Sequence, residues 1–80
     1  MVRLTLISRM YCHLCHEMES ALAPLLEEAG AEVEVIDVDE HPLLERDYGE
    51  HVPVLLHDKN ELCHFVLDVR KVRDYLGHFR

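Results

Sequence analysis

The chain has 80 residues, 49% of them hydrophobic, and its 16 acidic and 8 basic residues give a formal net charge of −8. This length allows a single domain, residues 1–80. The excess of carboxylates argues against binding to nucleic acids or anionic membranes, since both need clustered cations. The N-terminal segment is too short and too alternating for a signal peptide, and no apolar run approaches about 18 residues. We therefore expect a cytoplasmic protein, and a monomer.

The first half of the chain predicts two strands joined by a helix. Residues 2–8 alternate apolar with polar side chains, as a half-buried strand does. Apolar residues then recur at helical spacing from Cys15 to Ala29, and Gly30 follows where a left-handed helix end belongs. Residues 32–38 are rich in valine and predict a second strand. Together these elements can form a parallel unit with a right-handed crossover.

The second half predicts a short helix, two strands and a last helix. We expect a helix over residues 39–47 and an apolar strand, buried on both faces, over residues 52–56. After a turn, residues 61–65 form a fourth strand, and Asp68 caps the last helix. The order β-α-β-α-β-β-α predicts an α/β fold, a four-stranded mixed sheet flanked by helices with the first strand in its centre.

Two of the three cysteines form a C-x-x-C motif, Cys12-His13-Leu14-Cys15, between the first strand and the first helix. A helix N-terminus favours a thiolate, so we expect Cys12 to have a lowered pKa and to act as the attacking thiol. His13 and Arg9 are expected to add positive charge nearby. Cys15 lies one turn later in the apolar stripe of the helix, where burial raises the pKa of a thiol. That contrast suits stepwise disulfide exchange, with Cys15 as the resolving thiol.

The same motif also occurs in metal sites. The motif and its neighbour offer four soft or borderline ligands, namely Cys12, His13, Cys15 and His16. A C-x-x-C supplies only half of a tetrahedral site, however, and the one candidate for the other half is Cys63-His64, without a partner cysteine. Redox chemistry without a bound cofactor is favoured over binding of zinc or an iron–sulfur cluster. A redox-sensing domain that binds a partner is a third alternative.

Four segments carry a resemblance to a known family: residues 9–15, residues 37–40, Tyr48-Gly49 and residues 52–55. Along nearly its whole length, the chain resembles a small glutaredoxin-like protein of the thioredoxin superfamily. The resemblance implies a thioredoxin-like fold and a disulfide oxidoreductase. It also implies that Cys12 is the nucleophile, that Cys15 is the resolving thiol, and that Pro53 is a cis-proline facing them.

The resemblance extends to residues around the motif. Arg9 lies where glutaredoxins place a cation for a glutathione carboxylate, and Asp68 lies at their acidic helix cap. Tyr11 is expected either to form one wall of the site or to pack over the start of the helix. If the Val52-Pro53 bond is cis, the backbone of Val52 turns outward beside the dithiol and can pair with an extended substrate.

The departures from the glutaredoxin pattern concern glutathione. His13 and Leu14 stand where glutaredoxins typically have Pro-Tyr, and Val52 stands where they have Thr. Their Gly-Gly turn is replaced by residues 65–67, Phe-Val-Leu, whose side chains would crowd the γ-glutamyl end of glutathione. We therefore expect protein or low-molecular-weight disulfides as partners, with glutathione a poor specific ligand.

Overall fold

One sheet combines parallel and antiparallel pairing in the computed structural model, which describes residues 2–79. The strands β1 (Arg3–Ser8) and β2 (Glu32–Asp37) are parallel and joined by helix α1 (His13–Ala29). Strand β3 (Val54–His57) pairs antiparallel with β1, and β4 (Asn60–His64) pairs antiparallel with β3. The order β2-β1-β3-β4 places β1 in the interior, which confirms the expected four-stranded mixed sheet.

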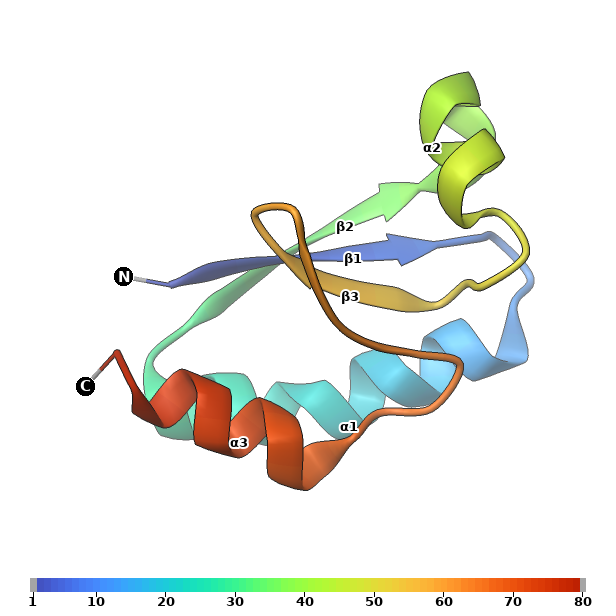
Figure 1. Cartoon of the computed structure of the whole chain (residues 1–80). Coiled ribbons are helices and arrows are strands. Elements are labelled where there is room, and N and C mark those ends of the chain that lie inside the picture. Colours follow the sequence, from blue (N-terminus) through green and yellow to red (C-terminus); the bar gives the residue numbers. More distant parts are fainter. Residues whose placement is uncertain (1, 80) are drawn as a thin grey trace.

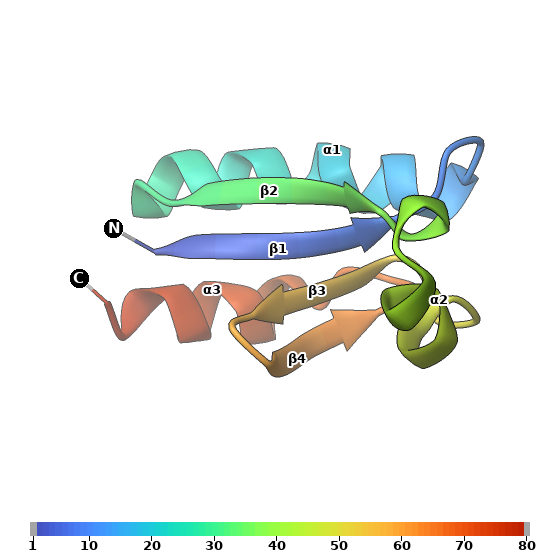
Figure 2. The ribbon, with the colours of Figure 1, turned by 90° about the horizontal axis from the view of Figure 1, so that it is seen from above.

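The two faces of the sheet are covered unequally (Figures 1 and 2). Helices α1 and α3 (Val69–Gly77) lie side by side along one face, whereas the short helix α2 (Pro42–Tyr48) lies beyond the other face at one end of the strands. The larger core lies under α1 and α3, and it includes Leu4, Leu6, Met18, Leu22, Leu25, Leu55, Leu62, Val72 and Leu76. A smaller core, formed by Ile7, Val38, Val54 and Leu56, lies at the α2 end.

The prediction that the third strand is buried on both faces is confirmed for β3. Val54, Leu55 and Leu56 are all buried, because Leu55 faces the larger core while its two neighbours face the smaller one. The strand begins one residue after Pro53, which has no N–H to donate to a ladder. It therefore starts later than the expected residue 52.

The helix expected over residues 39–47 is divided in two. A 3-10 turn, η1 (Val38–Glu40), precedes α2, and His41 between them is extended, with φ −133° and ψ 90°. The physical reason is Pro42, whose ring disfavours helical backbone at the residue before it but suits the first turn of a new helix. The expectation of one continuous helix was therefore wrong.

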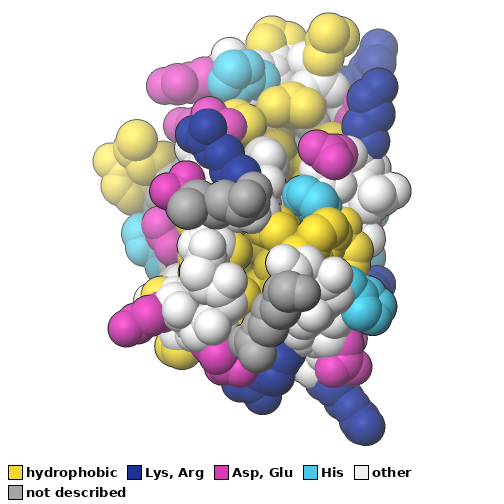
Figure 3. Space-filling model, turned by 90° about the vertical axis from the view of Figure 1, so that its left-hand side faces the viewer, with side chains coloured by type: hydrophobic (Ala, Val, Ile, Leu, Met, Phe, Trp, Pro, Cys, Tyr) yellow, Lys and Arg dark blue, Asp and Glu magenta, His cyan; other side chains and the backbone are white. Residues whose placement is uncertain are grey.

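Strand β1 begins, and helix α3 ends, at the end of the molecule away from α2 (Figure 1). Figure 3 views that end, where hydrophobic side chains occupy the centre of the face and charged side chains surround them.

Phe79 is part of an aromatic cluster, with its ring centroid 5.4 Å from that of His57 and 5.3 Å from that of Tyr75. No helix within residues 2–79 is long and apolar enough to span a membrane.

Gly30 ends α1 as the sequence predicts, with φ 65° and its N–H bonded to Glu27 O at 3.3 Å. A Cβ at Gly30 would meet no atom within 4 Å, so only the left-handed backbone opposes a side chain. Gly30→Ala is expected to lower the free energy of unfolding by about 1–2 kcal/mol. Gly77→Ala, which also has open space but an ordinary φ, is the control and should raise it by about 0.5 kcal/mol. Urea denaturation measures both, and equal effects would contradict the assignment.

Candidate active site

Cys12 is the N-cap of α1, at the end of the sheet where β1 leads into the helix. Its backbone is extended, with φ −98° and ψ 112°, and its sulfur accepts a hydrogen bond from the N–H of Cys15 at 3.2 Å. The Cys12 N–H donates to Arg9 O at 3.2 Å, which closes the turn between strand and helix. The sulfur thus faces the unpaired N–H groups of a helix start, a position that favours negative charge.

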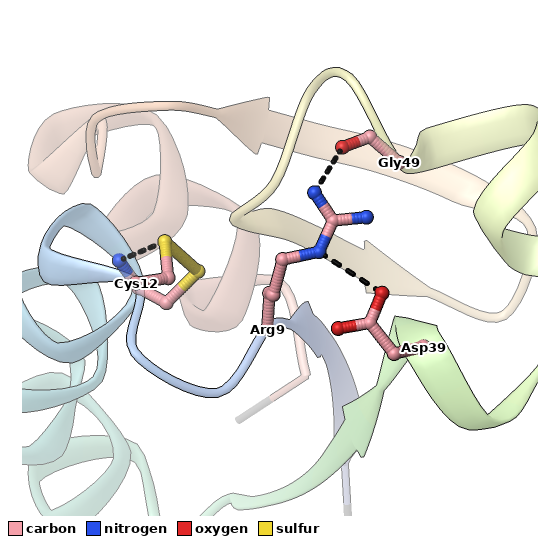
Figure 4. The surroundings of a disulfide bond; sticks show 5 residues. Arg9, Cys12, Asp39 and Gly49 are labelled. Carbon is pink, nitrogen blue, oxygen red and sulfur yellow. Dashed lines mark hydrogen bonds and ion pairs between the residues drawn. A yellow bond between two sulfur atoms is a disulfide. The ribbon is translucent and has the colours of Figure 1, made fainter.

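The sulfurs of Cys12 and Cys15 are joined in a disulfide, with Cα atoms 5.2 Å apart (Figure 4). The two residues differ sharply in exposure, since Cys15 is only 1% exposed and Cys12 is half-buried. Cys15 belongs to the buried face of α1 that also contains Met18 and Leu22. The pair therefore consists of one partly exposed residue and one that is shielded by the core, as the helical spacing predicts.

The side chain of Arg9 contacts other residues of the chain. Its guanidinium donates to Asp39 Oδ1 at 3.1 Å and to Gly49 O at 3.4 Å, and it lies 3.6 Å from Glu45 Oε1. Figure 4 shows the side chain reaching toward Asp39 and Gly49, away from the disulfide. Two carboxylates of the chain, those of Asp39 and Glu45, therefore share the charge of Arg9. Arg9 ties the turn before Cys12 to η1, to α2 and to the loop after α2.

His13 and Tyr11 flank Cys12 but point outward. His13 is 87% exposed, and its Nε2 lies 2.9 Å from Glu17 Oε1 one turn along α1, so a protonated imidazole is paired there. Tyr11 is 95% exposed, so the expectation that it packs over the helix start is wrong. A shallow surface hollow is bordered by Tyr11, Cys12, His13 and His16.

The Val52-Pro53 peptide bond is cis, and this loop lies at the same end of the molecule as the turn before α1 (Figures 1 and 2). Pro53 is buried, while Val52 is half-buried and packs against the smaller core. The N–H of Phe65 donates to Pro53 O at 2.9 Å, so the loop after β4 is anchored to the proline. Asp68 begins α3 as its cap, accepting the N–H of Lys71 at 3.0 Å.

Cys63 is a free thiol on β4, half-buried against the larger core. Burial raises the pKa of the Cys63 thiol above its usual 9.0, so the thiol stays protonated at neutral pH. Cys63 therefore acts as a small apolar residue of the strand. Within residues 2–79 no three His, Cys, Asp or Glu side chains are grouped to hold a metal ion.

Sequence reasoning missed an apolar groove beside the disulfide. It is lined by Leu14, Met18 and Ala21 of α1 and by Phe65, Val66 and Val69 near the start of α3. The available signal was the pair of bulky apolar segments, residues 10–14 and 65–69, which contribute little to either core. Residues 65–67 were considered only as an obstacle to glutathione.

A family described as "Glutaredoxin-like domain (DUF836)" matches residues 3–77. The chain belongs to this family. Among curated relatives, the uncharacterized protein Rv0508 of Mycobacterium tuberculosis is 32% identical over 73 residues, covering 85% of this chain and 75% of its own length. The family match confirms the resemblance to glutaredoxin-like proteins drawn from the sequence.

Solved structures agree with that assignment. Protein Ne2328 from Nitrosomonas europaea is 38% identical, with a TM-score of 0.81 covering 92% of this chain and 89% of that chain. A single-residue mutant of thioredoxin from Halobacterium salinarum is 30% identical, with a TM-score of 0.65 covering 98% of this chain and 74% of that chain. A thioredoxin-like fold with a paired Cys12 and Cys15 supports a function of the redox type.

Proposed function

We propose that this protein is a thiol–disulfide oxidoreductase in which Cys12 attacks and Cys15 resolves. The observation that carries the proposal is that the half-buried Cys12 caps α1 with its sulfur and is bonded to the buried Cys15. Hydrogen bonding at a helix start stabilises the attacking thiolate. Burial keeps Cys15 from external disulfides, yet one helical turn leaves it within reach of Cys12.

The exchange proceeds in two displacements. In the reduced protein, the Cys12 thiolate attacks one sulfur of a substrate disulfide, and the other substrate sulfur leaves as a thiolate. Cys15 then loses its proton and attacks Cys12, which releases the second substrate thiol and forms the Cys12–Cys15 disulfide. The substrate has gained two electrons and two protons, and a dithiol reductant returns the protein to its reduced form.

The substrates proposed are disulfides of proteins or of small molecules, with no bound cofactor. The Val52 backbone, two residues before β3, remains the proposed pairing site for an extended substrate chain. Glutathione is a poor candidate because Arg9, the cation expected for its carboxylate, is paired with Asp39 and Glu45. Residues 65–67, Phe-Val-Leu, also replace the Gly-Gly turn of glutaredoxins and would crowd the γ-glutamyl end of glutathione.

The test is reduction of insulin disulfides by a catalytic amount of the protein, with dithiothreitol as the electron donor. We expect turnover above that of dithiothreitol alone, and loss of this turnover in Cys12→Ser. Metal content is measured on the same protein, purified without chelator. Stoichiometric zinc or iron in a protein that accelerates no disulfide reduction would replace this proposal with the metal-binding alternative.

A further inference from the structure

Exposed apolar side chains gather on the two segments beside the disulfide. Among residues 2–79, nine large hydrophobic side chains are exposed, and six of them lie in the segments 10–14 and 65–69. These six are Met10, Tyr11, Leu14, Phe65, Val66 and Val69. Single exposed hydrophobics need no explanation, but a group of this size at a reactive site indicates a binding surface.

Four of these six, namely Leu14, Phe65, Val66 and Val69, line the groove described above, which has a volume of about 210 Å³. It begins at Leu14, which lies between the two cysteines and is 40% exposed. It then runs along α1 past Met18 and Ala21, with Phe65 and Val66 on the opposite side. Leu14 lies in the first turn of α1, the turn that Cys12 caps, so the groove starts at the same helix end as the reactive sulfur.

Backbone strain marks the same two segments. Tyr11 and Phe65 each have φ 63°, the left-handed region that costs a residue with a Cβ about 1–2 kcal/mol. Asp58, which has φ 57°, lies in the β3–β4 turn, where aspartate tolerates this conformation. Bulky residues held in strained conformations cluster at functional sites. Here the strained residues are Tyr11, directly before the motif, and Phe65, which lines the groove.

The groove carries almost no charge. Among residues 2–79, Glu17 is the one charged residue that lines it, and its carboxylate lies 2.9 Å from His13 Nε2. Within the same range no cation lines the groove, and Arg9 is paired with Asp39 and Glu45. The net charge of −8 adds a general repulsion of anionic partners. Glutathione brings two carboxylates and no bulky apolar group, and so it fits this surface poorly.

We propose that the groove binds a bulky apolar side chain next to the cysteine of an extended protein segment. It thereby selects neutral or basic protein disulfides over glutathione. This proposal rests on the oxidoreductase function and names its substrate class. Binding energy comes from burial of the apolar side chain against Leu14, Val66 and Met18, and Cys12 is the thiol that attacks the substrate disulfide.

The experiment uses the reduced full-length protein and mixed disulfides of thionitrobenzoate, whose release is followed by absorbance. The thiols are a capped peptide with phenylalanine beside cysteine, the same peptide with glutamate there, glutathione, and 2-mercaptoethanol as a reference without side chains. We expect the phenylalanine peptide to react at least about tenfold faster than the glutamate peptide or glutathione. Rates for all four are compared as second-order constants.

Val66→Asp places a charge in the groove. For each protein we take the ratio of the rate constant for the phenylalanine peptide to the rate constant for the 2-mercaptoethanol reference. In Val66→Asp this ratio should be about tenfold lower than in the wild type. Val66→Ile should retain the wild-type ratio. Leu43→Asp is the matched control, since Leu43 is 68% exposed on α2 and Val66 is 69% exposed, and it should leave the ratio unchanged.

The outcomes separate the two proposals. If the reference disulfide reacts normally but the two peptides and glutathione react at equal rates, the groove does not select substrates. An unchanged rate ratio in Val66→Asp would mean the same. Either result would overturn the groove proposal and leave the oxidoreductase function standing. Preference for glutathione would also overturn it. No reaction even with the reference disulfide would remove both proposals.

Discussion

Cys12→Ser is expected to reduce disulfide exchange by at least roughly a thousandfold, the order seen when an enzyme loses its nucleophile. Cys15 cannot substitute for Cys12, because it is 1% exposed and packs in the α1 face of the core. Stopped-flow measurement with a peptide disulfide gives the rate. A residual rate near that of wild type would show that the attacking thiol had been misassigned.

Cys15→Ser should fail in a different way. Attack by Cys12 remains possible, but the thiol that breaks the mixed disulfide is missing, so the intermediate accumulates. Mass spectrometry should find the protein bonded to its substrate through Cys12, and dithiothreitol should release it. Cys63→Ser is the matched control, since it removes a free, half-buried thiol on β4 and should turn over like wild type. Loss of bound metal in both motif variants without any trapped substrate would instead indicate a metal site.

The sequence predicts those features that depend on neighbours along the chain. The alternation of residues 2–8 gave β1, and the spacing from Cys15 to Ala29 gave α1 and the burial of Cys15. Gly30 and Asp68 were assigned correctly as helix boundaries because capping is local. The order of elements was enough to predict the mixed sheet and its interior β1.

Contacts between residues distant in sequence could not be predicted. The sequence shows Arg9 three positions before Cys12, but it does not show that Asp39 of η1 and Glu45 of α2 pair with its guanidinium. The groove is a similar case, since Leu14 and Val66 meet only after α3 packs beside α1. Local pattern identifies the reactive pair, whereas its surroundings depend on tertiary packing.

Iodoacetamide is expected to alkylate Cys12 of the reduced protein roughly a hundredfold faster than Cys15 at neutral pH. Two effects act in the same direction. Cys12 is half-buried and caps a helix with its sulfur, which favours the reactive thiolate. Cys15 is almost fully buried, so its sulfur is shielded from the reagent. Peptide mass spectrometry after timed quenching assigns each rate to its cysteine.

Cys63 provides an internal comparison in the same sample. Because burial raises the pKa of its thiol above 9.0, its thiolate fraction is small at pH 7 and grows only as the pH passes that value. Its alkylation should therefore be slow near neutrality and rise steeply in alkaline solution, while Cys12 is already fast. His13→Gln should change the Cys12 rate less than about twofold, because the imidazole is directed to Glu17. Equal rates at Cys12 and Cys15, or a large loss in His13→Gln, would mean that the helix start is not what activates Cys12.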